Sequence, residues 1–95
     1  MFARVISAQN AADGLDSAIR IAQEQLPGIR DQPGFSGFYF LADRTSGKLM
    51  TISLWQSRED LRRVESRAAR LRSKAAGEIG LNRPRVDIYE VAVPA

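Results

Sequence analysis

The pattern of apolar and polar residues predicts four strands and two helices in the order βαββαβ. β-Branched and aromatic residues that alternate with smaller or polar ones mark the strands, whereas apolar residues three and four positions apart mark the helices. A turn over residues 43–48 joins the two middle strands and offers Gly47 for a positive φ. The strands are predicted over residues 2–9, 35–42, 49–56 and 86–93.

The first predicted helix has an N-cap candidate in Asp13, and Asp16 follows three residues later. A carboxylate there favours the start of a helix. Pro27 and Gly28 predict its end, because proline and glycine both interrupt helices. Its apolar stripe consists of Leu15, Ile19, Ala22 and Leu26.

The second predicted helix follows the third strand directly. Ser57 and Asp60 have the spacing of a capping box, in which the serine accepts a backbone N–H at the helix start. Gly77 and Gly80 predict where this helix stops. Its apolar stripe consists of Leu61, Val64, Ala68, Leu71 and Ala75.

This element order predicts the fold class. Right-handed crossovers turn βαββαβ into a ferredoxin-like α+β fold, with a four-stranded antiparallel sheet and two helices on one face. The 95 residues contain no internal repeat or linker, so we expect one domain over 1–95.

Both middle strands are apolar on both faces, although two helices can cover only one face of the sheet. An isologous homodimer that stacks sheet on sheet would cover the other face. Alternation places Phe35, Gly37, Tyr39 and Leu41 on one face of the second strand, and Ser36, Phe38, Phe40 and Ala42 on the other. In the third strand it separates Met50, Ile52 and Leu54, assigned to the interface, from Leu49, Thr51, Ser53 and Trp55.

Composition excludes several kinds of site. The chain has neither cysteine nor histidine, which rules out disulfides, thiolate nucleophiles, Cys/His zinc sites and a histidine base. No apolar run approaches the roughly 20 residues that span a bilayer. We therefore expect a cytoplasmic protein with no membrane partner.

The net charge of +3 is too small to indicate nucleic acid. The third strand also lacks the basic-glycine-aromatic signature of RNA-recognition domains, which share this element order. A basic stripe on the second helix is interpreted as a solvated face, with an anionic ligand or phosphates as the alternative. That stripe consists of Arg63, Arg67, Arg70 and Lys74.

Two segments carry a family resemblance. Residues 32–38, QPGFSGF, and residues 53–61, SLWQSREDL, resemble the antibiotic biosynthesis monooxygenase family of dimeric α+β barrels. The resemblance implies a barrel formed by two sheets across a dimer interface, and a ligand pocket between each sheet and its own helices. Members of the family include cofactor-independent oxygenases of aromatic polyketides and quinols, and haem-degrading enzymes.

The haem-degrading branch matches this chain only in part. Trp55 corresponds to its tryptophan on the third strand, and its first-strand asparagine falls on Ser7, with Asn10 nearby. Its iron-ligating histidine has no counterpart, because the chain contains no histidine. We therefore do not expect that arrangement for haem oxygenation.

The substrate-binding candidates are aromatic or small polar residues on the strands. The Trp55 ring could form a pocket wall and its indole N–H could donate to a substrate oxygen, although a core or interface role is equally compatible. Ser7 could orient a ligand or be a satisfied buried hydroxyl. Phe38, Phe40 and Tyr39 could contact an aromatic ligand or simply pack, and no residue is identified as a catalytic base.

Two functions follow from the resemblance. The first is a cofactor-independent monooxygenase that acts on a small aromatic substrate, such as a quinol or polyketide, and O2. The alternative is a non-catalytic dimer that binds a small molecule in the same pocket. Neither function requires a cofactor or a metal.

Overall fold

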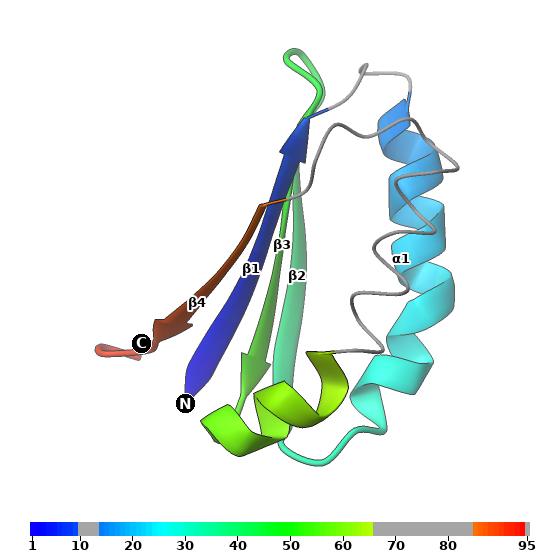
Figure 1. Cartoon of the computed structure of the whole chain (residues 1–95). Coiled ribbons are helices and arrows are strands. Elements are labelled where there is room, and N and C mark those ends of the chain that lie inside the picture. Colours follow the sequence, from blue (N-terminus) through cyan, green and yellow to red (C-terminus); the bar gives the residue numbers. More distant parts are fainter. Residues whose placement is uncertain (10–13, 66–84, 95) are drawn as a thin grey trace.

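The structure is a computed structural model that describes residues 1–9, 14–65 and 85–94. Figure 1 shows a sheet with the helical segments on one side. The turns of the second helix are described over residues 58–65. The elements are β1 (Phe2–Gln9), α1 (Leu15–Arg30), β2 (Phe35–Asp43), β3 (Lys48–Trp55) and β4 (Arg85–Glu90).

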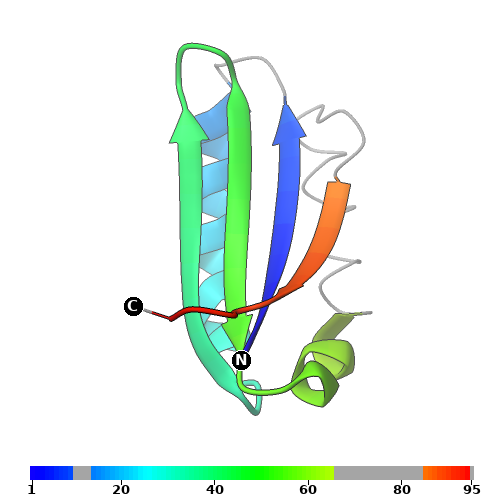
Figure 2. The ribbon, with the colours of Figure 1, turned by 90° about the vertical axis from the view of Figure 1, so that its left-hand side faces the viewer.

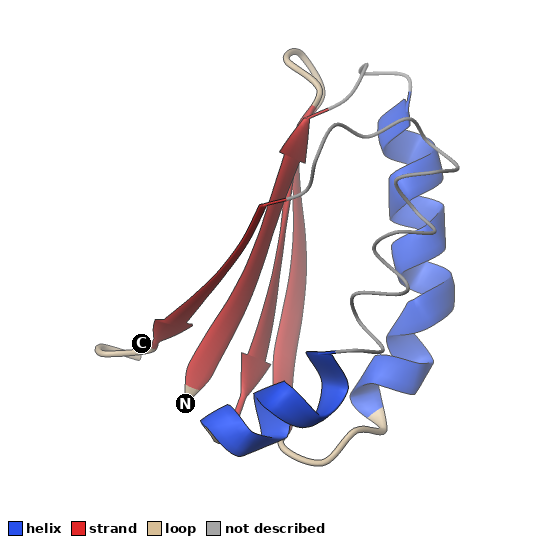
Figure 3. Ribbon diagram, viewed as in Figure 1, coloured by secondary structure: helices blue, strands red, loops and turns tan. Residues whose placement is uncertain are grey.

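The four strands form one sheet in the order β2-β3-β1-β4, and every neighbouring pair is antiparallel. Helix α1 and residues 58–65 lie on the same side of this sheet (Figure 3). The opposite side is seen face-on in Figure 2, where neither of the described helical segments covers the strands. The ferredoxin-like α+β fold is therefore confirmed, while the homodimer stays a prediction. We call the side without helices the open face.

The first helix differs from the sequence prediction at both ends. Its N-cap is Gly14, without a side-chain cap, and the expected cap Asp13 lies outside the described residues. The helix also continues through Pro27 to Arg30. Proline has a helical φ, and near a helix end it costs only one backbone hydrogen bond. The last helical turn, after Pro27, is stabilised because Ile29 packs against the buried residues Trp55, Leu61 and Val64. The Gln32 side chain donates to the Gly28 carbonyl, at 3.2 Å.

The buried face of α1 is also rotated from the predicted stripe. Leu15 is buried as expected, but Ala18 and Ile21 are the other buried residues. The predicted members Ile19, Ala22 and Leu26 are half-buried. The helix therefore sets its Ala18 side against the sheet, where Ala18 packs with Leu49 of β3.

A β-bulge at Ser36 corrects the predicted faces of β2. The register shifts between Phe35, which pairs with Trp55, and Gly37, which pairs with Leu54. Because the extra residue interrupts the alternation, Phe35 lies on the same side as Trp55 rather than with Tyr39. The prediction that Phe35 shares a face with Gly37, Tyr39 and Leu41 was wrong.

The register supports the remaining assignments of faces, since paired residues share a face. Leu49 and Trp55 lie on the helix side, where both are buried. Met50 pairs with Leu41 on β2 and with Ser7 on β1, all on the open face. Large side chains are exposed there, including Tyr39 (60%), Tyr89 (55%), Leu41 (49%) and Met50 (37%).

The last strand ends at Glu90, three residues before the predicted end. Glu90 pairs with Phe2, the first residue of β1, and one further hydrogen bond joins the Val91 N–H to the Met1 carbonyl at 2.9 Å. Residues 91–94 then turn away and cross in front of the open face in Figure 2. The ladder with β1 is complete at that point, so alternation alone overestimated the strand.

The turn between β2 and β3 is organised by Asp43. Its carboxylate accepts the backbone N–H groups of Thr45 and Ser46, at 3.0 and 3.3 Å, and Gly47 has the expected positive φ of 79°. Hydrogen bonds from the Ser46 side chain, then from the Ser46 and Thr45 backbones, lower the pKa of Asp43 below its ordinary value.

Because the pKa of Asp43 is lowered, the stability of this turn should depend on pH in the acid range. Because the folded-state pKa is depressed, the ionised carboxylate stabilises the turn above about pH 4. That contribution is lost as the pH falls through the lowered pKa. A carboxyl NMR titration should give Asp43 a midpoint below the ordinary value of an aspartate. In Asp43→Asn, whose side chain can still accept both N–H groups, this part of the pH dependence should disappear; an unshifted Asp43 midpoint would contradict the assignment.

Candidate functional site

Among the described residues, the helix side of the sheet carries two separate hydrophobic clusters. We call them the Leu49 cluster and the Trp55 cluster after the β3 residue in each. The Leu49 cluster contains buried Leu15, Ala18 and Leu49, with Ala8 and Phe40 packed against them. The Trp55 cluster contains buried Trp55, Leu61 and Val64, with Phe2, Ile29 and Phe35 packed against them. The two clusters lie at opposite ends of the strands.

Between the clusters lies a stretch of the sheet that is partly polar. On β1, Arg4 and Ile6 separate Phe2 from Ala8, and at about 3.3 Å per residue those ends are about 20 Å apart. On β3, Thr51 and Ser53 separate Leu49 from Trp55. We call these helix-side residues the polar middle: Arg4, Ile6, Phe38, Thr51 and Ser53, with Ser53 paired to both Arg4 and Phe38.

The Trp55 ring forms one wall of this region. It is 2% exposed and meets the Phe35 ring edge-to-face, with centroids 5.8 Å apart. Its indole N–H donates to the Ser53 hydroxyl at 3.0 Å, so it points back along β3 toward the polar middle. The guanidinium of Arg58 lies 5.1 Å from the Phe2 ring centre and covers this end of the cluster. Trp55 thus has both a packing role and a polar group directed at the candidate site.

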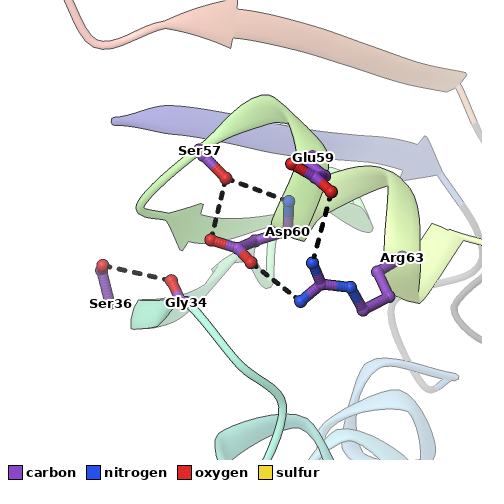
Figure 4. Close-up of polar contacts among 6 residues, drawn as sticks. All are labelled: Gly34, Ser36, Ser57, Glu59, Asp60 and Arg63. Atoms are coloured by element: carbon purple, nitrogen blue, oxygen red, sulfur yellow. Dashed lines mark hydrogen bonds and ion pairs between the residues drawn. The ribbon is translucent and has the colours of Figure 1, made fainter.

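A tight bracket of backbone and side chains holds Trp55 in place. Ser57 accepts the Asp60 backbone N–H at 3.1 Å and donates to its carboxylate at 2.8 Å (Figure 4), which confirms the predicted cap. Asp60 and Glu59 both pair with Arg63, at 3.0 and 3.7 Å. The carbonyl of Gly34 accepts the Gln56 N–H at 2.8 Å, directly after Trp55.

Gly34 is the residue of this bracket that tolerates no side chain. Its φ is 81°, and a β-carbon there would overlap the Asp60 carboxyl group. Gly34→Ala is expected to lower the free energy of unfolding by about 1–3 kcal/mol from backbone strain alone, with displacement of Asp60 adding to it. Chemical denaturation followed by circular dichroism measures the change.

Gly37→Ala is the matched control, because a β-carbon there would meet only the flexible end of Leu54, at 3.3 Å. It should cost clearly less than Gly34→Ala. Equal losses for the two variants would show that the positive φ and the Asp60 contact do not matter.

The predicted site residues fall on two different faces. Trp55, Phe38 and Phe40 lie on the helix side, with Phe40 against the Leu49 cluster and Phe38 in the polar middle. Tyr39, which pairs with Ile52, and Ser7, which pairs with Met50, lie on the open face. Ser7 borders a wide-open hollow of about 640 Å³ that also includes Leu41 and Met50. The structure therefore places three of the five candidates on one face of the sheet, with Phe40 at the other end from Trp55, and separates Ser7 and Tyr39 from them.

The residue that the sequence interpretation missed is Arg4. It is 3% exposed, and among the residues that the structure describes it is the one buried charged or polar residue. The signal was present in the sequence, because Phe2, Arg4, Ile6 and Ala8 share a face and only Arg4 is charged.

The predicted basic stripe is described only at Arg63, which pairs with Glu59 and Asp60 and is half-exposed. Its other members lie outside the described residues, as do Ala68, Leu71, Ala75, Gly77 and Gly80. Within the described ranges, no helix is long and apolar enough to cross a membrane, and no three acidic side chains gather as metal ligands would.

Comparison with solved structures places this arrangement among known folds. The monooxygenase ActVA-Orf6 of Streptomyces coelicolor, in complex with nanaomycin D, superimposes with a TM-score of 0.77 at 19% identity, over 99% of this chain and 92% of its own. The cofactor-independent oxygenase SnoaB of Streptomyces nogalater gives 0.68 at 17% identity, over 98% and 94%. The chain has the fold of the antibiotic biosynthesis monooxygenases.

The same fold occurs in the heme-degrader MhuD of Mycobacterium tuberculosis, whose structure has two hemes bound in its active site. It superimposes with a TM-score of 0.76 at 15% identity, over 100% of this chain and 99% of MhuD. No protein-family model and no curated protein sequence matches the chain. The family resemblance predicted from the two sequence segments is thus confirmed in the fold.

Proposed function

We propose that this chain is a cofactor-independent monooxygenase of a small aromatic substrate, and that its site is the polar middle between the two hydrophobic clusters. The observation that carries the proposal is the position of Trp55, Phe38 and Ser53 around one helix-side region in a fold shared with ActVA-Orf6 and SnoaB. Aromatic walls would hold a flat ring, and the few polar groups would orient it.

This reaction requires little of the protein beyond binding the substrate and excluding water from it. An electron-rich quinol that has lost a proton can itself reduce O2: one oxygen atom enters the ring, and the other leaves as water with two further substrate electrons. Positioning the ionised ring and excluding bulk water are then the main tasks of the site. The hydroxyls of Ser53 and Thr51 and the indole N–H of Trp55 are the described polar groups suited to positioning.

We further propose that the working form is a homodimer joined through the open face. Support comes from the exposed Tyr39, Leu41, Met50 and Tyr89 on that face, which form an apolar surface of the kind that marks an interface. Ser7 and the hollow beside it would then lie at the interface rather than in the substrate site.

Oxygen consumption tests the enzymatic proposal. The purified chain, incubated with a panel of dihydroxynaphthalenes and anthrones, should consume O2 in proportion to substrate and form the corresponding quinone. Trp55→Phe keeps an aromatic wall but removes the indole N–H, so turnover should fall while the protein stays folded. Absence of protein-dependent O2 uptake across the panel would overturn the proposal.

The alternative is a non-catalytic binding protein with the same site. It is favoured by the lack of any described carboxylate in the polar middle that could act as a base. Saturable quenching of Trp55 fluorescence by panel compounds, without O2 uptake, would support it. Haem ligated through a histidine is excluded by the sequence, which contains none.

A further inference from the structure

The two ends of the open face have opposite shapes. At the end where β1 begins, residues 91–94 leave β4 and pass in front of β1, β3 and β2 (Figure 2). Figure 1 shows this segment standing clear of the sheet on its open side. We call it the tail. Its Val93 is 89% exposed, more than any other large hydrophobic side chain that the structure describes. The tail is thus an apolar protrusion at one end of the open face.

The other end of the open face is concave. The hollow of about 640 Å³ lies where β1 ends, and its described lining residues belong to β1, β2 and β3. Leu41 and Met50 give it apolar side chains, while Asp43 and Lys48 supply charged groups beside the turn. Its volume is in the range of cavities that take a small molecule, so it can also take a few side chains.

The tail cannot reach the hollow of its own chain. The Val91 N–H donates to the Met1 carbonyl at 2.9 Å, which fixes the start of the tail beside Met1. Ser7, in the hollow, lies six positions further along β1, which is about 20 Å at about 3.3 Å per residue. Four extended residues span at most about 14 Å. A tail that fills the hollow must therefore come from another molecule.

Two orientations of a two-fold axis would stack a second copy on the open face. An axis parallel to the strands would bring tail against tail at one end and hollow against hollow at the other. The tails would then hold the sheets apart, and the hollows would enclose a void, which proteins avoid. An axis perpendicular to the strands places each tail over the hollow of the other protomer. The tail crosses β1, β3 and β2, the same three strands that line the hollow.

We propose that the tail of each protomer docks in the hollow of its partner, with Val93 against Leu41 and Met50. The two sheets then stack with their strands running in opposite directions. This inference rests on the homodimer of the proposed function, and it specifies how the two copies meet. The contact occurs twice in each dimer, because an isologous interface pairs the same two surfaces in both directions. The hollow is then part of the interface.

Engineered disulfides test the docking, since the chain contains no cysteine of its own. The double variant Val93→Cys with Met50→Cys, equilibrated in a glutathione redox buffer, should form a disulfide-linked dimer on a non-reducing gel. A disulfide within one chain requires Cα atoms within about 7 Å, and these two positions lie at opposite ends of the open face.

Each single cysteine variant should stay a single chain on the same gel, because the two copies of Val93, and the two copies of Met50, lie far apart in the proposed dimer. The matched control combines Val93→Cys with Glu24→Cys. Glu24 is an exposed residue of α1, on the helix side of the sheet, so this pair should not cross-link either.

Val93→Asp measures how much the tail contributes. Because Val93 is 89% exposed in the single chain, the change should leave the unfolding midpoint of the monomer unaltered. The dissociation constant of the dimer should rise about a hundredfold or more, since two buried valines are lost from each dimer. Sedimentation velocity over a dilution series gives this constant.

Several results would overturn the inference. Cross-linking of the Val93→Cys single variant would show that tail meets tail, and cross-linking of the Met50→Cys single variant would show that hollow meets hollow. A double variant that stays uncross-linked while the wild type is dimeric would leave the hollow to another occupant, such as a small molecule. That result rejects the docked tail and keeps the homodimer. A monomeric wild type rejects both, and O2 uptake decides the enzymatic proposal separately.

Discussion

Trp55→Ala should lower the free energy of unfolding by about 3–5 kcal/mol, because it removes a fully buried indole from the Trp55 cluster and leaves a cavity. The ring is 2% exposed and contacts Phe35 edge-to-face, while Leu61 and Val64 of the second helix are buried in the same cluster. A domain of this size has about 5–15 kcal/mol of stability in total, so the variant should lie close to the limit of folding.

Urea denaturation followed by far-ultraviolet circular dichroism measures this loss, since the variant has no tryptophan to report by fluorescence. Trp55→Phe is the matched control. It keeps ring packing and should lose clearly less, with the unpaired Ser53 hydroxyl and the smaller ring as the sources of the cost. A loss below about 1 kcal/mol for Trp55→Ala would mean that the cluster does not depend on its largest member.

Leu41→Glu should convert the proposed homodimer into a monomer. Leu41 is 49% exposed at the rim of the hollow beside Met50 and Ser7. In an isologous dimer each change occurs twice, and each protomer loses an apolar contact of about 1.5–3 kcal/mol and places a carboxylate in an apolar interface. Light scattering after size exclusion should give twice the 10.5 kDa chain mass for wild type and the single-chain mass for the variant.

Arg30→Glu serves as the control, because Arg30 is exposed in the last turn of α1, on the helix side of the sheet. This variant should remain dimeric. A wild-type chain that is monomeric at tens of micromolar, or a Leu41→Glu variant that still forms dimers, would reject the open face as the interface.

The sequence predicted the fold well because its local signals agree with one another. The Ser57–Asp60 cap and the Gly47 turn appear as expected, and both depend only on residues within the turn. Strand alternation also separated Met50 from Leu49 and Trp55. Such features need no knowledge of distant partners.

The features that the sequence did not predict depend on contacts between residues far apart in the chain. Helix α1 passes Pro27 because Ile29 finds buried partners in the Trp55 cluster, and strand β4 stops where β1 has no further residue to pair. The bulge at Ser36 moved Phe35 to the helix side, which no alternation pattern could reveal. Arg4 was overlooked because a single charged residue in a strand is normally interpreted as exposed. Its burial becomes evident only when both faces of the strand have been assigned.

The two sequence segments behind the family resemblance have structural roles besides supplying Phe38, Ser53 and Trp55 to the candidate site. Gly34 makes room for Asp60, Ser57 caps the helix with it, and the Gly34 carbonyl holds the chain after Trp55. These contacts fix the position of the tryptophan. Solved structures with this fold hold ligands as different as nanaomycin D and heme.

In the part of the chain that the structure describes, the apolar core is divided into two clusters, and this limits how the protein can be stabilised by engineering. Apolar substitutions at Arg4, Thr51 or Ser53 would join the Leu49 and Trp55 clusters into one continuous core, and we expect them to raise thermal stability. The same substitutions would remove the polar groups from the region that we propose as the ligand site. Variants selected for heat resistance alone should therefore accumulate changes at these three positions and lose affinity for aromatic ligands.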